Sequence, residues 1–378
     1  MNAISALPLL TFPMHGQRKL LEEGYRTRDG HMIEWFGRHL DGQSSVQVIS
    51  RPEPAISLTK RRVGTPAHNT VSVERRTFRV PKLTDKRHWW VRSASAYPAL
   101  SVIAEGAASV VWNPFLSLAP QASNPFSAGG PVVLDLLDDW TIHYAFSSIR
   151  PRVEKAYAAA FAAAEHVTAN AEGTAELARR FGRDDVHLLP NGVDPERFST
   201  GSLATGPTTI GYVGKIGRRL DLDGIVATVQ ARPDHRFVFA GPILDDEYRA
   251  PLAQLPNATL LGDVHYDAVP GLLASFDVGW VPHRVGDGEV GGDVIKTYEY
   301  RAAGLPVLTT PITGASSRGL TDVHVARIDS HADWLGAVAS AGPRVARRTT
   351  ETPADMTWRK KSAFVLDLLG WVPSDASR

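Results

Sequence analysis

Two glycines followed by a lysine and a glutamate form the stretch best suited to holding a phosphate ester. Residues 291–307 read GGDVIKTYEYRAAGLPV, and the pattern predicts a helix that ends at AAGLP. Free amides and the helix dipole favour an anion at such a helix start. Lys296 adds a cation, and Glu299 on the same face could accept hydrogen bonds from ribose hydroxyls. This indicates a diphosphate site; a surface Lys–Glu pair is the alternative.

A second candidate phosphate site follows a predicted strand. Residues 211–219 read GYVGKIGRR, so the strand ends in glycines and cations ahead of a helix. Backbone amides and positive charge at such a turn bind phosphate groups. The glycine spacing differs from the dinucleotide fingerprint G-x-G-x-x-G, and a tight turn with solvated arginines is the alternative. Between the two halves, residues 188–198 read LLPNGVDPERF and predict a turn. The proline restricts the backbone, and the Asn-Gly pair after it tolerates left-handed conformations.

Aspartate and histidine side chains in the first half are candidates for proton transfer and for holding a hydroxyl group. Asp138, Asp139 and His143 follow a predicted strand, and RDGH at residues 28–31 precedes a predicted helix. Histidine suits proton transfer near neutral pH, and aspartate can accept a hydroxyl proton. Helix caps or solvated loop residues are the alternative.

Predicted strands and helices alternate in both halves, which favours an α/β fold with two parallel, doubly wound sheets. The first half is expected to have strands at 7–12, 46–49, 109–112, 131–137 and 167–170 and helices at 33–40, 151–164 and 175–181, with a long polar loop between the first strand and residue 30. The second half is expected to have strands at 208–213, 235–240, 258–261, 277–281 and 306–309 and helices at 222–230, 269–274 and 296–303, followed by a last helix through 358–368. A ligand should bind where the strands end, in a cleft between the sheets.

Composition excludes several classes of protein. The 378 residues are 43% hydrophobic, which suits two cores and rules out a mostly disordered chain. The 41 basic and 40 acidic residues balance, which argues against nucleic acid as a partner. The chain has no cysteine, so thiolate zinc sites and thiol nucleophiles are excluded. The histidines lack a metal-binding spacing and Asp221 with Asp223 suits a helix cap, so we expect no metal. No apolar run approaches the roughly 20 residues of a membrane span, and we expect a cytoplasmic protein.

One stretch of the first half is basic. Residues 51–92 carry eleven Lys and Arg against three acidic residues, and Trp89 and Trp90 stand among the cations of residues 75–92. Cations beside tryptophans suit peripheral contact with an anionic membrane or a lipid-linked acceptor. We favour the alternative, a solvated surface with both tryptophans packed locally.

Together, these strings resemble the GT-B-fold glycosyltransferases, especially glycosyltransferase family four. The likeness rests on PNGVD, the glycine and cation loop, and the helix that runs into AAGLPV, with FAGP (239–242), LGDV (261–264) and FDVGWVP (276–282) between them. The string LDLLDDW at 134–140 resembles polysaccharide and teichuronic-acid type members. The resemblance implies two Rossmann-like domains facing a central cleft, residues 1–190 for the acceptor and 191–354 for a nucleotide sugar. The last helix, 355–378, is expected to pack back onto the first domain.

The resemblance also implies a role for individual residues. Glu299 would bind the ribose, and the backbone at Val264 would border the base. Asp138, Asp139 and His143 would act at the acceptor hydroxyl, with Asp29, Gly30 and His31 beside the acceptor. The donor diphosphate would lie against Lys215, with Arg218 or Arg219, and against Gly291, Gly292 and Lys296.

The sequence departs from the family at one acidic position and at Lys215, where the family's glycine and cation loop has an arginine. The family has an acidic residue eight positions before the ribose-binding glutamate, where this chain has Gly291. Glu289 and Asp293 flank that position, so either residue, or neither, takes the sugar-contacting role. The implied activity is transfer of a sugar from a nucleotide-diphosphate sugar to a hydroxyl acceptor, with retention and without a cofactor. The alternatives are a nucleotide-sugar epimerase, which would need no acceptor, and a non-catalytic nucleotide-binding protein.

Overall fold

The chain divides into two compact units. The computed structural model describes residues 7–55, 65–82, 84–286 and 289–372. Unit 1 comprises Met1–Pro190, Val290–Gly292 and Trp358–Arg378, and unit 2 comprises Asn191–Glu289 and Asp293–Thr357. Within the described residues, no helix has both the length and the apolar composition to cross a bilayer.

Unit 1 is built on a parallel sheet. Within the described residues, its seven strands run in the order β4-β2-β1-β6-β7-β8-β9, and all neighbours are parallel. The strands are β1 (Leu9–Phe12), β2 (Val46–Ile49), β4 (Thr70–Val73), β6 (Ser109–Val111), β7 (Val132–Leu136), β8 (His166–Ala169) and β9 (Val186–Leu188). A separate short pair joins β3 (Glu53–Pro54) to β5 (Arg76–Thr77). Because β2 and β6 flank β1 on opposite sides, the winding direction of the sheet reverses at β1.

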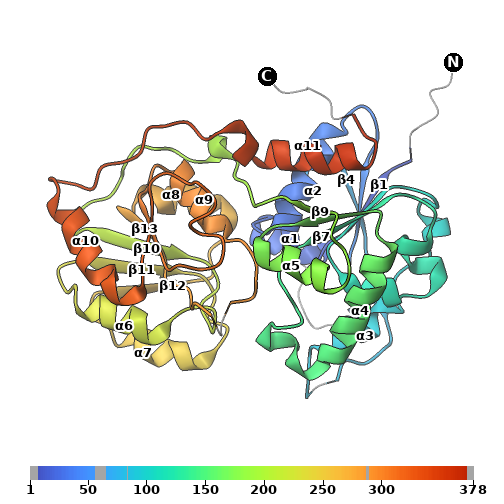
Figure 1. The fold of residues 1–378 in the computed structure, drawn as a ribbon, viewed down its shortest axis with the longest axis horizontal. Coiled ribbons are helices and arrows are strands. Elements are labelled where there is room, and N and C mark those ends of the chain that lie inside the picture. The colour runs from blue at the N-terminus through green and yellow to red at the C-terminus, as the bar shows by residue number, and fades with distance from the viewer. Residues whose placement is uncertain (1–6, 56–64, 83, 287–288, 373–378) are drawn as a thin grey trace. The chain divides into compact units, whose positions relative to one another are not determined.

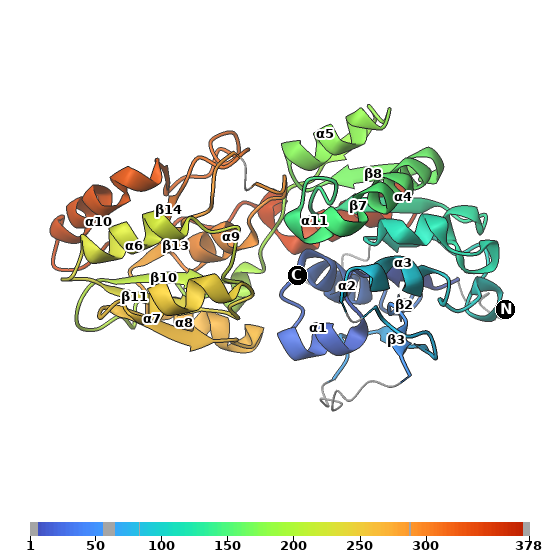
Figure 2. The ribbon, with the colours of Figure 1, turned by 90° about the horizontal axis from the view of Figure 1, so that it is seen from below.

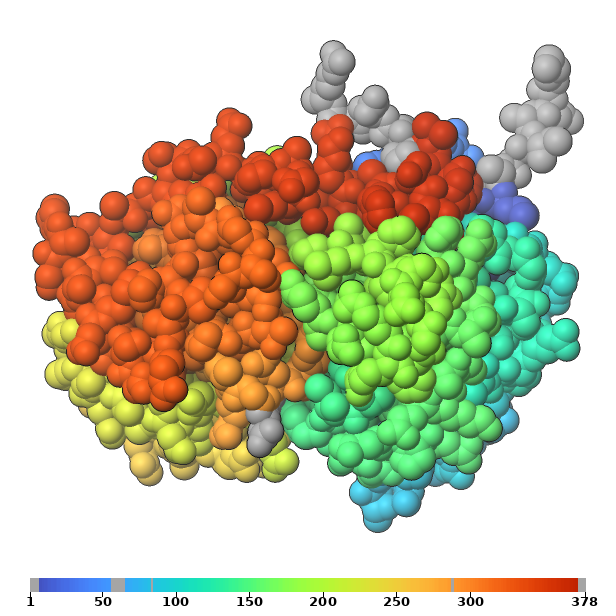
Figure 3. Space-filling view, viewed as in Figure 1, coloured from blue at the N-terminus to red at the C-terminus, as the bar shows by residue number. Residues whose placement is uncertain are grey.

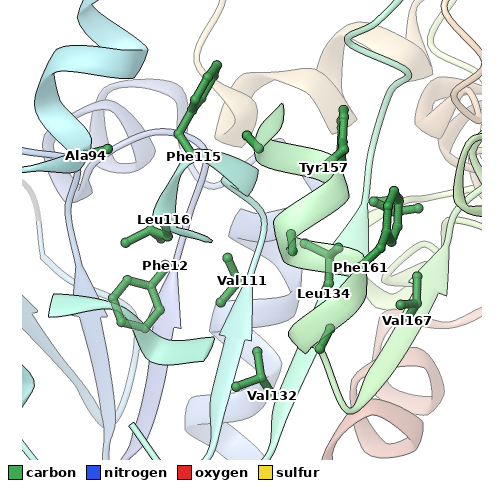
Figure 4. Packing of buried hydrophobic residues seen from close by; sticks show 14 of the residues in the cluster. Phe12, Ala94, Val111, Phe115, Leu116, Val132, Leu134, Tyr157, Phe161 and Val167 are labelled. Carbon is green, nitrogen blue, oxygen red and sulfur yellow. The ribbon is translucent and has the colours of Figure 1, made fainter. Parts of the chain in front are cut away.

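Helices of unit 1 pack around this sheet and on one another. They are α1 (Gln17–Glu23), α2 (Arg28–His39), α3 (His88–Ala94), α4 (Arg150–Ala163), α5 (Glu172–Arg180) and α11 (Trp358–Leu368). Figure 4 shows Tyr157 and Phe161 of α4 among core residues of the strands, including Val111, Leu134 and Val167. The C-terminal helix α11 packs along α2 (Figure 1), where the His39 ring lies 3.1 Å from the Ser362 hydroxyl. Figure 3 shows α11, in red, at the surface of the molecule.

Unit 2 has a parallel sheet with the same winding principle. Within the described residues, its six strands run in the order β12-β11-β10-β13-β14-β15. They are β10 (Thr209–Val213), β11 (Arg236–Ala240), β12 (Ala258–Gly262), β13 (Val278–Val281), β14 (Val307–Thr309) and β15 (Val323–Val325). The order reverses between β10 and β13, which pair in parallel through Ile210–Val278 and Gly211–Gly279. Ligands of doubly wound sheets bind beyond the carboxyl ends of the strands at such a reversal.

Helices cover both faces of the second sheet. They are α6 (Leu222–Gln230), α7 (Arg249–Ala253), α8 (Val269–Ala274), α9 (Ile295–Ala302) and α10 (His331–Ser340). Residues of α6 and α10 belong to one core cluster and residues of α8 and α9 to another, so the sheet separates two apolar layers. Figure 2 shows α6 and α10 on one side of the sheet and α8 on the other.

The expectation of two doubly wound α/β units is confirmed, but one loop assignment is wrong. The stretch expected as a polar loop up to residue 30 contains α1, and α2 already begins at Arg28. The helix α1 is short and mostly polar, with only Leu20 as a buried apolar residue, so its apolar periodicity is weak. Ion pairs at i and i+4, such as Arg18–Glu22 at 2.9 Å, support it instead. The strands β3, β4, β5, β9 and β15 and the helices α3, α7 and α10 were also not expected.

A fully buried ion pair ties α2 to β7 in unit 1. Arg28 and Asp135 are 2% and 1% exposed, and the guanidinium donates to both carboxylate oxygens at 2.7 and 2.9 Å. The Trp112 indole and the Thr168 hydroxyl each donate to the same carboxylate at 2.6 Å. Removing one partner of a buried pair is costly because it leaves the other charge buried and uncompensated.

We therefore expect Arg28→Ala to destabilise the protein by about 3–5 kcal/mol, because Asp135 stays buried without its cation. Arg38→Ala, on the exposed face of the same helix, should cost under about 1 kcal/mol. Urea unfolding followed by circular dichroism measures both. A loss below about 1 kcal/mol for Arg28→Ala would show that the pair does not hold α2 against the sheet.

Candidate functional site

The reversal point of the unit 2 sheet brings the two predicted phosphate-binding strings together. The carboxyl end of β10 leads directly into Gly214, and the carboxyl end of the neighbouring β13 leads into Pro282 and His283. Lys296, in the first turn of α9, reaches back to Gly214. The cations of residues 211–219 and the lysine of α9 therefore lie at one place on the sheet.

Because Gly214 has no side chain, the ammonium group of Lys296 can approach the backbone there. Its φ is +150°, and a Cβ there would lie 2.8 Å from Lys296 Cε and 3.2 Å from Nζ, so only glycine fits. The Lys296 Nζ also lies 5.1 Å from the ring centroid of Tyr212, within the range of a cation–π interaction. The Tyr212 hydroxyl donates to the carbonyl of Lys215 at 2.8 Å and so holds the loop in place.

The surroundings of Lys296 disfavour its charge. Burial is the largest cause that lowers the pKa of Lys296; Glu299 acts in the opposite direction, the positive charges of Arg219 and Lys215 add to the lowering, and the resulting pKa is about 8. Desolvation and repulsion from two neighbouring cations thus act on this ammonium group. Such a site favours an anion, since an anion would relieve both the desolvation and the mutual repulsion.

The two arginines of residues 211–219 have different surroundings. The Arg218 side chain is exposed and points to acidic partners, with Nε 3.4 Å from Glu247 and 3.8 Å from Asp245. Arg219 instead contributes its charge to Lys296, to Tyr212 and to His283. Of the two sequence alternatives, Arg219 is the one that lies with Lys296.

His283 belongs to this cluster and was missed by the sequence analysis. Its backbone forms an antiparallel bridge with Leu220, next to Arg219, and its carbonyl accepts from the Thr310 hydroxyl at 2.8 Å. Burial lowers the pKa of His283 well below its usual value, and the charges of Lys296 and Arg219 add to the shift. The position directly after β13, beside the sheet reversal, is the signal that could have identified it.

Glu299 lies one helical turn beyond Lys296 and is 5% exposed. Its carboxylate lies near Tyr266, and burial together with this neighbouring negative charge raises the pKa of the tyrosine well above its usual value. The Arg197 guanidinium lies over the Tyr266 ring at 5.4 Å and pairs with Asp194 at 3.1 Å. Val264, the predicted neighbour of the base, is partly buried two residues before Tyr266.

Asp293 anchors the turn between the two halves. Its carboxylate accepts from the Asn191 amide at 2.8 Å and from the Tyr298 hydroxyl at 2.8 Å, and its carbonyl accepts from the Asn191 side chain at 3.1 Å. The asparagine of PNGVD is therefore fastened to the start of α9. Glu289 likewise has backbone partners, since its two oxygens accept from Gly286 and Thr313 at 3.1 and 2.9 Å.

Gly291 and Gly292 belong to unit 1, where they pack against the strand end that carries the candidate catalytic aspartates. The Asp139 amide donates to the Val290 carbonyl at 2.7 Å. A Cβ at Gly292 would overlap the Asp138 carboxylate and the Leu137 carbonyl. This close backbone approach explains why glycine occupies the position.

The three candidate catalytic residues of this region have different surroundings. The Asp139 carboxylate is buried and accepts from Thr141 and from the Arg180 guanidinium, so it holds the loop to α5. Asp138 is partly exposed. The His143 ring accepts from the Ala145 amide through Nδ1 at 3.0 Å, which leaves a proton on Nε2 in the neutral ring. His143 is thus set up as a hydrogen-bond donor.

The predicted acceptor-side residues are buried within unit 1. Asp29, Gly30 and His31 lie in the first turn of α2 instead of before it, and Asp29 and His31 are both fully buried. The Asp29 carboxylate accepts from the Met14 amide at 3.0 Å, and burial raises the pKa of this acid. The His31 ring stacks on Trp358 of α11 at 4.9 Å. These contacts hold α2 to its neighbours.

Comparison with protein families gives two matches in succession. Residues 36–197 match Glycosyltransferase Family 4, and residues 207–341 match Glycosyl transferases group 1. A Bacillus subtilis (strain 168) protein, TuaH, whose name assigns it to teichuronic acid biosynthesis as a glycosyltransferase, is 29% identical over 145 residues. That stretch spans 36% of this chain and 36% of TuaH, so it covers about a third of the relative's length.

Several solved structures share the fold over nearly the whole chain. The Anabaena protein HepE, in complex with UDP and glucose, aligns over 96% of this chain and 97% of its own, with a TM-score of 0.62 and 14% identity. A UDP-forming trehalose-phosphate synthase from Burkholderia xenovorans aligns over 97% and 99%, with a TM-score of 0.66 and 12% identity. With a glycosyltransferase family 4 domain followed by a group 1 domain on this shared architecture, the chain belongs to the GT-B-fold glycosyltransferases.

Proposed function

We propose that the chain transfers a sugar from a nucleoside diphosphate sugar to a hydroxyl group of an acceptor, and that unit 2 binds the donor. The observation that carries this proposal is the position of Lys296. Its ammonium is held against Gly214 and Tyr212, among the charges of Arg219 and Lys215. A desolvated cation beside two further positive charges is a costly arrangement that a bound diphosphate would stabilise.

The comparisons support the choice of donor class. HepE was solved with UDP and glucose, and the Burkholderia enzyme is a UDP-forming synthase. Glu299, buried one turn from Lys296, would hold ribose hydroxyls, which carboxylate oxygens accept well. Val264, after β12, would border the base.

The same cations would serve the chemistry. When the bond between the anomeric carbon and the diphosphate breaks, its electron pair stays on the leaving oxygen, and negative charge develops there. Cations and amides already in place stabilise that charge without reorganising, which is commonly the largest contribution to rate. We propose that Lys296, Arg219 and Lys215, with the amides after β10, do this in place of a metal ion.

For the acceptor we propose Asp138 and His143 of unit 1. Asp138 is partly exposed and could accept a hydrogen bond from the hydroxyl, while the His143 Nε2–H could donate one. Asp139 would hold the loop through Arg180. We further propose retention, with the leaving phosphate accepting the hydroxyl proton. NMR of the anomeric proton of the product determines whether the configuration is retained, and an inverted product would contradict the proposal.

Replacing Lys296 with Met should lower turnover roughly 10²–10³-fold, because one preorganised charge at the leaving group is lost. Stability should be unchanged or higher, since the desolvated ammonium is gone. Arg219→Met should behave similarly, whereas Arg218→Met, which removes the partner of Asp245 and Glu247, should change turnover less than about threefold. Steady-state assays with a chelator present, together with thermal melting, provide the measurements.

Full turnover in Lys296→Met would refute the diphosphate assignment. Loss of activity on chelation would instead refute the proposal that no metal is needed. Sugar released or rearranged from donor alone, with no transfer to any acceptor, would place the activity with the epimerase or hydrolase class.

Binding of a nucleoside diphosphate should depend on pH through Lys296. Its pKa of about 8 in the free protein should rise when the diphosphate binds, so binding above pH 8 takes up a proton. Affinity for UDP should be level below pH 8 and fall by up to tenfold per pH unit above it. Calorimetric titration between pH 7 and 9 measures this. The Lys296→Met variant should lose the dependence; an equal slope in both proteins would contradict the assignment.

A further inference from the structure

The basic stretch of unit 1 presents apolar side chains to solvent. Phe78 is 91% exposed and Val80 is 64% exposed, directly after the short strand β5. Val71, on the edge strand β4, is also exposed. Single exposed apolar residues are common on proteins. Here Phe78 and Val80 are both exposed two residues apart, and this apolar surface gains none of the stabilisation that burial would give it.

The backbone of this segment is held in place while its side chains stay outside. The strand β5 pairs with β3, and the Ala55 amide donates to the Thr77 carbonyl at 2.7 Å. The Arg92 guanidinium donates to the Val80 carbonyl at 2.6 Å. Phe78 therefore lies between two anchored points. An exposed aromatic side chain on an anchored backbone is a feature of surfaces that meet a partner.

Positive charge surrounds Phe78. Between residues 74 and 92 the sequence has seven Lys and Arg and two acidic residues. Arg76, Arg79, Lys82 and Lys86 are exposed, and within the described residues none of these four side chains forms an ion pair with a carboxylate. The two acids have local partners, since Glu74 lies near Ser72 and Asp85 pairs with His88 at 3.4 Å.

The two tryptophans of this stretch do not share this exposure. Trp89 is buried and donates through its indole to the Pro52 carbonyl at 3.1 Å. Trp90 is buried between the Arg51 guanidinium, 3.7 Å from its ring centroid, and the Trp140 ring at 5.0 Å. The local packing that we favoured from the sequence is thus confirmed for both. Phe78 and Val80, which the sequence analysis did not single out, are the exposed apolar residues.

We propose that residues 71–82 form a docking surface for an anionic lipid bilayer, with Phe78 and Val80 entering the interface. Arg76, Arg79 and Lys82 would lie at the headgroups. Each cation near an anionic leaflet adds to binding, and an inserted aromatic ring adds a contribution that does not depend on charge. A polyanion such as RNA would use the cations without needing the apolar residues between them. The proposal does not depend on the proposed sugar transfer.

Co-sedimentation of the full chain with vesicles tests this surface. The protein should bind vesicles that contain phosphatidylglycerol and not vesicles of phosphatidylcholine alone, and salt should weaken the binding. Phe78→Ser should lower the partition coefficient roughly tenfold, and the double variant Arg76→Glu with Arg79→Glu by at least as much. Thermal melting should be unchanged in both, because the side chains are exposed.

Two matched controls come from unit 1. Val102→Ser alters another exposed apolar residue, 83% exposed, and Arg152→Glu with Lys155→Glu makes the same change in charge on α4. Neither should change the partition coefficient more than about twofold. Equal binding to both kinds of vesicle, equal losses in the controls, or unaltered binding of Phe78→Ser with loss only in the charge variant would each overturn the proposal. The last result would indicate a polyanion site.

Discussion

The position of one ammonium group is the constraint on which the proposed chemistry of unit 2 depends. Lys296 has left bulk water for a place between the Gly214 backbone and the Tyr212 ring, and that burial lowers its pKa to about 8. Leaving water costs free energy, and Arg219 and Lys215 add repulsion that Glu299 opposes. A diphosphate bound at the carboxyl ends of these strands would neutralise the positive charges, and its binding would explain why the ammonium is buried here.

The doubly wound sheet explains how residues from distant strings come to this place. The reversal of strand order between β10 and β13 leaves their carboxyl ends without a crossover helix above them. Gly214 follows β10 and His283 lies just beyond the end of β13 at this edge of the sheet. The helix α9 begins close enough for Lys296 to lie near both residues. Asp293 fixes the start of α9 by binding Asn191 and Tyr298. The motif residues therefore fall into two groups. Lys296 would contact a ligand, whereas Asp293 and Asn191 hold the helix that carries Lys296 in position.

Local pattern was sufficient to predict most strands and the positions of the two candidate phosphate strings after a strand and before a helix, because strand alternation and glycine-rich turns are properties of neighbouring residues. It could not separate Arg218 from Arg219, since the choice depends on Asp245 and Glu247 from another loop. Nor could it show that Asp29 and His31 are buried, because α11, which covers His31, lies more than three hundred residues along the chain. His283 was missed because only the pairing of β13 with β10 brings it to the cations.

A crystal structure of the chain with a bound nucleoside diphosphate would show whether Lys296 contacts the phosphates. We expect diphosphate oxygens about 2.7–3.2 Å from Lys296 Nζ and from backbone amides that follow β10, with the Arg219 guanidinium turned toward them. A nucleotide bound elsewhere in the chain, or one bound at β10 with Lys296 out of hydrogen-bonding reach, would contradict this expectation.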